Sequence, residues 1–188
     1  MEPAGTRPDD AARLKQLFDD HAGRLYAYCL RRAGDDAEEL VAETFLVAWR
    51  RIDVVPAEPL PWLFNVAGKL IANRRRGDRR REAFLTTMKA VQRSRTVAAA
   101  DPADEVATRF TVLQILDRLP PAEREALMLT AWDGLDVREG AKAAGCSRAT
   151  FSVRLHRARR RVMKELEATR HPLGEAPDAG HMEIGEAR

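Results

Sequence analysis

The sequence predicts an all-α protein made of two small helical domains joined by a flexible linker. Three observations favour this class: aromatic residues make up only 6% of the chain, alternating apolar and polar runs are short, and the helix formers Ala, Leu, Arg and Glu dominate. With 188 residues, the chain fits one ordinary domain or two small ones, which excludes a large multidomain enzyme.

Charge and cysteine content exclude several classes of protein. The net charge of +3 is too small to identify a partner, so the class of partner has to be inferred from the arrangement of the charges along the chain. Cys29 and Cys146 lie far apart and outside any C-x-x-C pair, which argues against a disulfide framework and a zinc ribbon. We expect no cofactor and no metal. Without an apolar run of about 18 residues or a signal-peptide pattern, we expect a cytoplasmic protein with no membrane insertion.

The first domain is expected at residues 10–85, after a disordered segment 1–9. Apolar residues at helical spacing predict a first helix from Asp10 to Arg32, with Phe18 and a packed His21 on its apolar face. Gly34 ends this helix, and Asp35 with Glu38 predicts a capping box for the next one. The second helix has a single buried stripe, formed by Ala37, Leu40, Val41, Thr44, Phe45, Ala48, Trp49 and Ile52.

A proline-rich loop and a third helix complete the first domain. The segment from Asp53 to Pro61 contains three prolines and cannot continue a helix, whereas the helical period returns from Trp62 onward. The third helix then runs into a basic segment, Arg74 to Arg81, with a net charge of +5. Such a segment faces either an anionic partner or water.

Residues 86–105 are small or polar, which is typical of a linker, and the second domain is expected at residues 106–169. Pro120 and Pro121 separate two of its helices. A capping box at Asp136, a break at Gly145 and a cap at Ser147 then predict a helix-turn-helix whose last helix runs through Leu166. The tail, residues 170–188, is rich in Pro and Gly and is expected to be disordered.

The last helix has one core face and one basic outer face. Phe151, Leu155, Ala158 and Val162 share the core face, and the stretch from Arg154 to Lys164 carries a net charge of +6. The outer face predicts a helix that reads the DNA major groove, although a solvated basic helix is the alternative. Its candidate DNA contacts are Arg148, Ala149, Ser152, Val153, Arg154, His156, Arg157 and Arg160.

The second helix has the opposite sign, with a net charge of −5 from Asp35 to Glu43. Acids near a helix N-terminus are favoured by the helix dipole, which explains Asp35 to Glu39 without any partner. Leu46 and Val47 lie off the buried stripe, so an acidic and apolar outer face suggests docking to a basic protein surface. Ordinary scattered exposure of apolar residues is the alternative.

Two long segments resemble a known family. DDAEELVAETFLVAWRRI followed by PWLFNVAGKLIANRRRGDRRR resembles region two of bacterial sigma factors of the extracytoplasmic-function (ECF) group. LPPAEREALMLTAWDGLDVREGAKAAGCSRATFSVRLHRARRRV resembles region four of the same group. Both segments stand in the family's order on either side of the expected linker.

The resemblance implies a transcription initiation factor that binds core RNA polymerase, through the clamp helices of its largest subunit and its flap region, and promoter DNA. Region four would read the minus-thirty-five element through the last helix, and an anti-sigma factor is a possible partner. The implied polymerase contacts are Asp36, Glu39, Glu43, Leu46 and Val47. The loop before the third helix would capture a minus-ten base and the helix would contact the strand, through Val55, Pro56, Ala57, Glu58, Asn73, Arg74, Arg75 and Arg76.

The second domain departs from the family pattern in its helix-turn-helix. Gly140 and Ala144 stand where larger apolar residues are usual, which thins the core, and Phe151 is expected to fill part of that space.

Two other functions are compatible with parts of the sequence. A dimeric helix-turn-helix repressor or activator would leave the acidic second helix without a role. A nuclease or recombinase would need the carboxylates between Asp35 and Glu43 to hold a metal, but Glu38 and Glu39 diverge around the helix. No P-loop, G-x-S-x-G or H-E-x-x-H motif occurs, so no enzymatic activity is expected.

Overall fold

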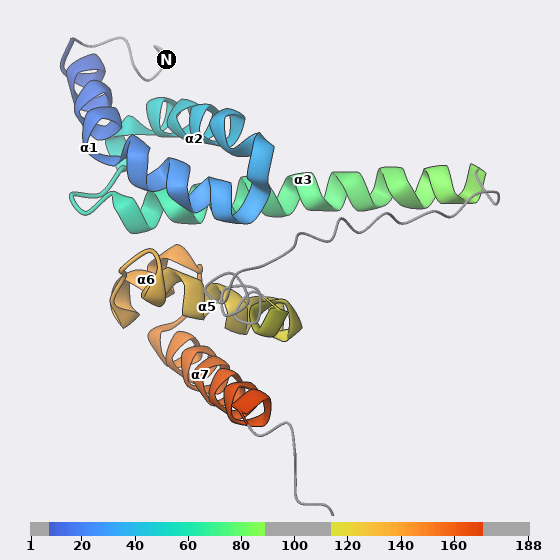
Figure 1. The fold of residues 1–188 in the computed structure, drawn as a ribbon. Coiled ribbons are helices and arrows are strands. Elements are labelled where there is room, and N and C mark those ends of the chain that lie inside the picture. The colour runs from blue at the N-terminus through green and yellow to red at the C-terminus, as the bar shows by residue number, and fades with distance from the viewer. Residues whose placement is uncertain (1–7, 89–113, 171–188) are drawn as a thin grey trace, which may run out of the picture.

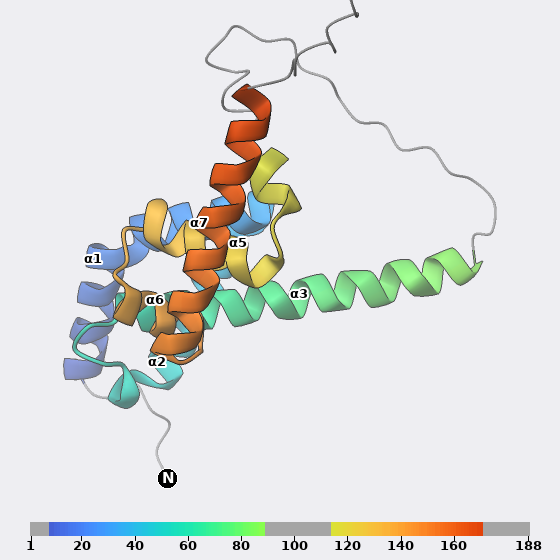
Figure 2. The same cartoon turned by 90° about the horizontal axis from the view of Figure 1, so that it is seen from below.

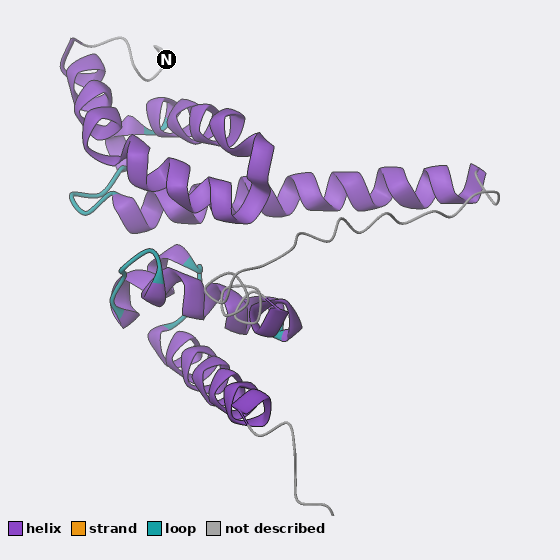
Figure 3. Ribbon diagram, in the orientation of Figure 1, coloured by secondary structure: helices purple, strands orange, loops and turns teal. Residues whose placement is uncertain are grey.

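The computed structural model describes the backbone of residues 8–88 and 114–170, and the side chains of residues 9–80 and 114–167. Within these ranges the chain consists of helices, turns and short loops, with no strand (Figure 3). The all-α class is therefore confirmed. None of the helices in the described part of the chain is long and apolar enough to cross a membrane.

The N-terminal layer contains three helices, α1 (Pro8–Ala33), α2 (Ala37–Arg50) and α3 (Leu60–Met88), with short 3-10 turns at Gly34–Asp36 and Ile52–Val54. α1 packs against both α2 and α3 (Figure 1). Leu25, Leu40 and Leu63 are completely buried between them. Tyr28 and Phe64 stack with ring centroids 4.4 Å apart, which ties α1 to α3.

Two details of the first two helices differ from the prediction. Gly34, at φ +60°, leads into a 3-10 turn, so α2 begins at Ala37 and its N-cap is Asp36, without a side-chain hydrogen bond. The predicted Asp35–Glu38 capping box is wrong, because Glu38 then stands one position too early. Phe18 is 50% exposed, since it lies at the edge of the contact with α2, where its ring is 5.0 Å from that of Phe45.

Several segment boundaries also differ. α1 begins at Pro8, inside the segment expected to be disordered. α3 begins at Leu60 and continues to Met88, past the expected linker start at residue 86, because neither Pro nor Gly follows Gly77 in this stretch. The rest of the expected linker, the first residues of the expected second domain (106–113) and nearly all of the expected tail lie outside the described residues.

The C-terminal layer contains a helical segment at residues 114–118 and the helices α5 (Pro121–Ala131), α6 (Val137–Ala143) and α7 (Arg148–Arg170). The predicted capping box is confirmed: the Glu139 N–H donates to Asp136 Oδ1 (2.8 Å), and the Asp136 N–H donates to Glu139 Oε2 (2.9 Å). Gly145, at φ +62°, makes the turn between α6 and α7. Ser147 caps α7 by accepting a hydrogen bond from the Thr150 N–H (3.1 Å). α7 extends to Arg170, beyond the predicted end at Leu166.

Phe151 fills the space that the small residues of α6 leave, as predicted. Its side chain is fully buried against Gly140, where an added Cβ would lie only 2.3 Å from the Phe151 Cζ. Leu155 and Ala158 continue the buried face of α7, as the sequence predicts.

The two layers are in direct contact. α6 packs against α3, and buried residues of both layers belong to one continuous apolar cluster. Figure 2 shows the C-terminal helices lying over α1 and α3 in the view from below. Asn65 on α3 donates to the carbonyl oxygen of Ala143 on α6 (2.9 Å), close to the turn at Gly145.

Candidate functional site

The acidic face of α2 surrounds an arginine from α3. The guanidinium of Arg74 lies 3.4 Å from Asp36 Oδ2, 2.9 Å from Glu39 Oε1 and 2.8 Å from Glu43 Oε1. Hydrogen bonds that the guanidinium donates to Glu39 and Glu43 raise the pKa of Arg74 above its ordinary value. The three acids therefore converge on a side-chain cation, and Glu38, which the sequence expects to diverge from Glu39, is not among them.

This placement bears on the predicted role of Arg74. The sequence groups it with Asn73, Arg75 and Arg76 as a DNA contact, but its charge is already engaged by the acidic face. α3 turns Arg74 toward α2, whereas Arg75 and Arg76 are exposed on other sides of the helix. Arg75 donates to the carbonyl oxygen of Arg32, and Arg76 donates to Asn73 Oδ1.

An apolar groove borders the acidic face. Leu46 is 52% exposed and Val47 is half-buried, so α2 does present apolar surface beside its acids. The groove lies between α1 and α2, has a volume of about 620 Å³, and includes Phe18 and Trp49 in its lining. Sequence reasoning missed the contribution of α1, because helical periodicity assigned Phe18 to the core.

The loop between α2 and α3 differs from the prediction at one residue. Pro56, Ala57 and Glu58 are exposed, as a base-binding loop requires, but the Val55 side chain is only 4% exposed. Val55 packs in the core, and its carbonyl oxygen accepts a hydrogen bond from Arg13 Nη2 (2.7 Å). The exposed valine is Val54, at 64%, which the sequence did not distinguish from its neighbour.

A small cavity of about 190 Å³ lies between this loop and α1. Pro56 and Ala57 line it from the loop, and Arg13, Asp20 and His21 line it from α1. The Nδ1 atom of His21 is buried without a hydrogen-bond partner among the described residues, and burial lowers the pKa of the imidazole. His21 is therefore partly packed, as predicted, and also borders a polar cavity.

α7 presents the basic face that the sequence predicts. Val153 on this face is 49% exposed. Arg157 and Arg160 are exposed and form no ion pair with any residue that the structure describes, whereas Arg161 pairs with Glu123 (3.0 Å). Most of the predicted DNA contacts are exposed and Arg154 is half-buried; the exposed ones are Arg148, Ala149, Ser152, Val153, His156, Arg157 and Arg160. A helix with such a face has the shape and charge to enter a major groove.

Neither cysteine is in a disulfide, and burial raises the pKa of the Cys29 thiol to about 11. Among the residues described, no group of three or more His, Cys, Asp or Glu side chains could hold a metal ion.

Comparisons with known proteins connect these surfaces to a family. Residues 17–82 match the family model Sigma-70 region 2, and residues 109–162 match Sigma-70, region 4. The chain is 32% identical over 178 residues to the ECF RNA polymerase sigma factor SigL of Mycobacterium tuberculosis, covering 89% of this chain and 98% of that protein. The chain belongs to the ECF sigma factors. It is also 31% identical to the RNA polymerase sigma factor NccH of Alcaligenes xylosoxydans xylosoxydans, over 85% of this chain and 90% of that protein.

Solved structures share the fold of this sigma factor. The sigma factor RpoE of Bartonella quintana, in complex with the anti-sigma factor NepR, has a TM-score of 0.60 at 24% identity, covering 81% of this chain and 96% of that one. CnrH, in complex with the cytosolic domain of CnrY, has a TM-score of 0.54 at 24% identity, over 82% and 88% of the two chains. As a sigma factor, the protein binds core RNA polymerase and promoter DNA and directs transcription initiation. The resemblance stated from the sequence is thereby confirmed.

Proposed function

We propose that this ECF sigma factor divides its contacts between surfaces of opposite charge and supports initiation without catalysing a reaction itself. The polymerase binds to the acidic face of α2, together with Leu46 and the neighbouring groove. The minus-ten element binds to the exposed loop residues Pro56, Ala57 and Glu58. The outer face of α7 binds the minus-thirty-five element. Helices α1, α2 and α3 form one functional domain, and the helices from α5 onward form the other. Since its partner polymerase is cytoplasmic, so is the site of action.

The observation that carries this proposal is the sorting of exposed charge. Asp36, at the N-cap of α2, and Glu39, on α2, have side chains 54% and 67% exposed, and Leu46 on the same helix is half-exposed. Arg157 and Arg160 on α7 have no acidic partner in the described part of the chain. DNA phosphates would be repelled by the first surface and attracted by the second, while a basic protein surface has the reverse preference.

Arg74 has a supporting role in this proposal. It neutralises part of the mutual repulsion among Asp36, Glu39 and Glu43, and it leaves each carboxylate with oxygen atoms that can accept further hydrogen bonds. We therefore assign Arg74 to shaping the polymerase surface and leave the strand contacts to Asn73, Arg75 and Arg76. Val55 supports the loop from the core, and Val54 is the exposed aliphatic side chain beside it.

Reconstituted transcription with bacterial core RNA polymerase tests the polymerase surface. Glu43→Lys should weaken polymerase binding, because it replaces an acid of the docking face by a base. Glu38→Lys is the matched control: it makes the same change on the same helix, at an exposed acid that does not contact Arg74. Equal binding by the two variants would remove Glu43 from the interface.

A second variant with its matched control tests the DNA surface. Arg157→Ala should weaken binding to duplex promoter DNA and reduce its salt dependence, with polymerase binding unchanged. Arg159→Ala removes another exposed arginine of α7, outside the proposed face, and should have a smaller effect. If core polymerase with the wild-type chain yields no promoter-dependent transcripts, the whole assignment fails, and stable binding to a palindrome alone would favour a repressor.

An anti-sigma protein is a further proposed partner. RpoE and CnrH, which share the fold, were solved with an anti-sigma factor and with a cytosolic domain of CnrY, respectively. The apolar groove beside Phe18 and Leu46 offers a surface on which such a protein could compete with the polymerase.

A further inference from the structure

Glu123 is a buried acid in the first turn of α5. In a capping box, a glutamate at this third helical position accepts a hydrogen bond from the backbone N–H of the N-cap residue. The N-cap of α5 is Pro120, and Pro121 follows it, so neither residue has an N–H to donate. The helix dipole favours an acid here but does not require the acid to be buried. The burial of the Glu123 carboxylate therefore has another cause.

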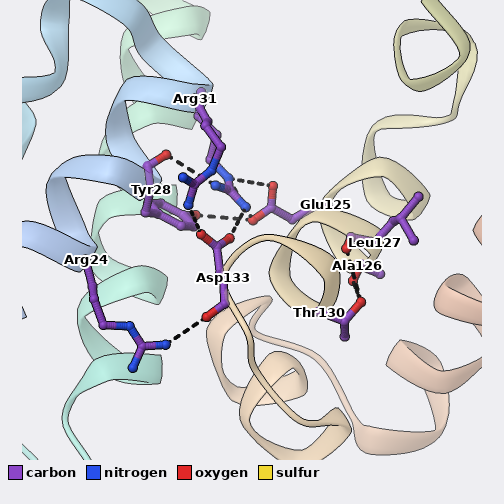
Figure 4. Close-up of polar contacts among 9 residues, drawn as sticks. Arg24, Tyr28, Arg31, Glu125, Ala126, Leu127, Thr130 and Asp133 are labelled. Atoms are coloured by element: carbon purple, nitrogen blue, oxygen red, sulfur yellow. Dashed lines mark hydrogen bonds and ion pairs between the residues drawn. The ribbon is translucent and has the colours of Figure 1, made fainter. Parts of the chain in front are cut away.

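The Glu123 side chain faces α7. Glu125 stands two residues further along α5, about 200° around the helix, and meets side chains of α1 instead (Figure 4). The Glu123 Oε2 atom lies 3.0 Å from the Nε atom of Arg161 on α7. Among the described residues, Arg161 is the only cation within ion-pair distance of Glu123, and the adjacent Arg124 pairs with Asp117.

This ion pair is buried at one end and open at the other. The Glu123 side chain is 9% exposed, whereas the Arg161 side chain is 59% exposed. Glu123 Oε2 accepts no well-directed hydrogen bond from the described residues, so its negative charge is balanced by the charge of Arg161. Because the acid faces Nε, the Nη1 and Nη2 atoms of Arg161 remain without a partner in the described part of the chain and keep their N–H donors.

Arg161 lies on the flank of the proposed DNA-reading face of α7. It follows Arg157 by one helical turn, so the two side chains are neighbours on the same side of the helix. It also lies about 20 Å along the axis from Arg148, the first residue of α7. The major groove is only about 12 Å wide, so a helix whose first residues reach the bases passes the phosphate backbone near Arg161.

We infer that Arg161 is a phosphate-binding residue of the DNA surface and that the buried Glu123 is its positioning residue. The inference rests on the proposed function, because it takes α7 as the DNA-reading helix. Glu123 holds the Nε side of the planar guanidinium, which leaves Nη1 and Nη2 directed to solvent, where a phosphate can accept from both. An arginine that is already oriented loses less side-chain entropy when it binds DNA.

An acid can also withhold an arginine from DNA by neutralising it. An acid with that role would occupy the terminal nitrogens, which are the donors best placed for a phosphate, whereas Glu123 faces Nε. Positioning and withholding give opposite results for Glu123→Gln, since a positioned arginine binds DNA less well without the acid and a withheld arginine binds DNA better.

Equilibrium binding of the full-length chain to a short labelled DNA duplex of arbitrary sequence provides the test, because phosphate contacts do not depend on the bases. Arg161→Ala should weaken binding about tenfold at low salt, as expected for a charge-assisted hydrogen bond. It should also reduce the salt slope, the change of log K with log salt concentration, by about 0.9, which is the value for one phosphate. A second duplex of unrelated sequence should show the same loss.

Glu123→Gln keeps the size of the side chain and removes its charge. It should weaken duplex binding about twofold or more, as expected for two residues that act together, even though it removes a negative charge from the domain. The loss should disappear in the Arg161→Ala background, because Glu123 acts through that arginine. Tighter binding by Glu123→Gln would mean that the acid withholds Arg161, and would overturn the inference.

Arg118→Ala is the matched control. Arg118 is 68% exposed and pairs with Glu165 of α7 (3.1 Å), so this variant also breaks an Arg–Glu contact of α7, but outside the DNA face. It should leave the salt slope unchanged. Circular dichroism checks that every variant is folded. If Glu123→Gln does not fold, Arg161→Lys replaces it: a lysine has no planar fork for the acid to orient, so wild-type affinity in that variant would overturn the positioning role.

The salt slope separates a phosphate contact from a purely structural ion pair. An unchanged slope in Arg161→Ala overturns the inference, since the pair would then only fasten α7 to α5. Arg157→Ala in the same assay distinguishes failure of the proposed function. If Arg157→Ala and Arg161→Ala both bind the duplex like the wild type, α7 is not the DNA-reading helix and both proposals fall, whereas a loss with Arg157→Ala alone overturns only this inference.

Discussion

Gly140→Ala should destabilise the helix-turn-helix, although alanine is the better helix former. In an open helix position the change from Gly to Ala is favourable by about 1 kcal/mol. At Gly140 the new Cβ would lie 2.3 Å and 2.7 Å from two atoms of the Phe151 ring. The ring is fully buried, so it has no free space to move into. Overpacking of this kind costs about 1–3 kcal/mol, and we expect the clash to exceed the gain in propensity.

Thermal unfolding followed by circular dichroism measures this effect. For a chain of this size, each 1 kcal/mol lost lowers Tm by roughly 2–4 °C. Gly23→Ala is the matched control, because it makes the same change inside α1, where nothing lies within 4 Å of the new Cβ. It should leave Tm unchanged or raise it. A Gly140→Ala protein as stable as Gly23→Ala would refute the packing argument.

A double-mutant cycle tests whether Phe151 is the cause. Phe151→Leu destabilises the domain by itself, because it shortens a fully buried side chain. In that background Gly140→Ala should cost clearly less than in the wild type, since the atoms that the Cβ meets are gone. An unchanged cost would mean that another contact is responsible.

Two further predictions concern the cap of α6 and the cysteines. Asp136→Ala should lower the urea midpoint of unfolding at neutral pH. The Asp136 carboxylate accepts a backbone hydrogen bond from Glu139, which lowers the pKa of Asp136. The stability that this cap contributes is therefore present above the ordinary aspartate pKa and is lost as the pH falls through the lowered pKa, where the midpoints of variant and wild type should converge. At pH 8 a thiol reagent should modify Cys146 rapidly and Cys29 only after denaturation, because Cys29 is buried with a pKa of about 11; two equally fast thiols in the native protein would contradict its burial.

Features with local causes could be predicted from the sequence. The capping box at Asp136, the turn at Gly145 and the cap at Ser147 each depend on residues within a few positions of one another, and all three are found in the structure. The buried face of α7 follows from helical periodicity in the same way. Where a local signal had two solutions, the prediction failed: after Gly34 the chain makes a 3-10 turn before the helix starts, so the cap lies at Asp36 instead of Asp35.

The side that a residue faces outside a helix could not be predicted. Val54 and Val55 are identical neighbours at the end of a 3-10 turn, yet one is 64% exposed and the other 4%. The direction of α1 beneath the loop decides between them, because Arg13 fixes the Val55 carbonyl. Likewise, periodicity assigned Phe18 to the apolar side of α1, but it does not tell how much of that side the neighbouring helices cover.

By itself, the sequence determined the helical class, the helix-turn-helix and the signs of charge on α2 and α7, because each of these is fixed within one helix or one turn. Only the tertiary structure decided which charges meet. Arg74 faces the acids of α2, and Arg31 and Arg32 face an aspartate about a hundred residues away in the chain. An ion pair requires two side chains within a few ångströms of each other. That distance is set by the packing of whole helices, and the sequence around either partner does not indicate it.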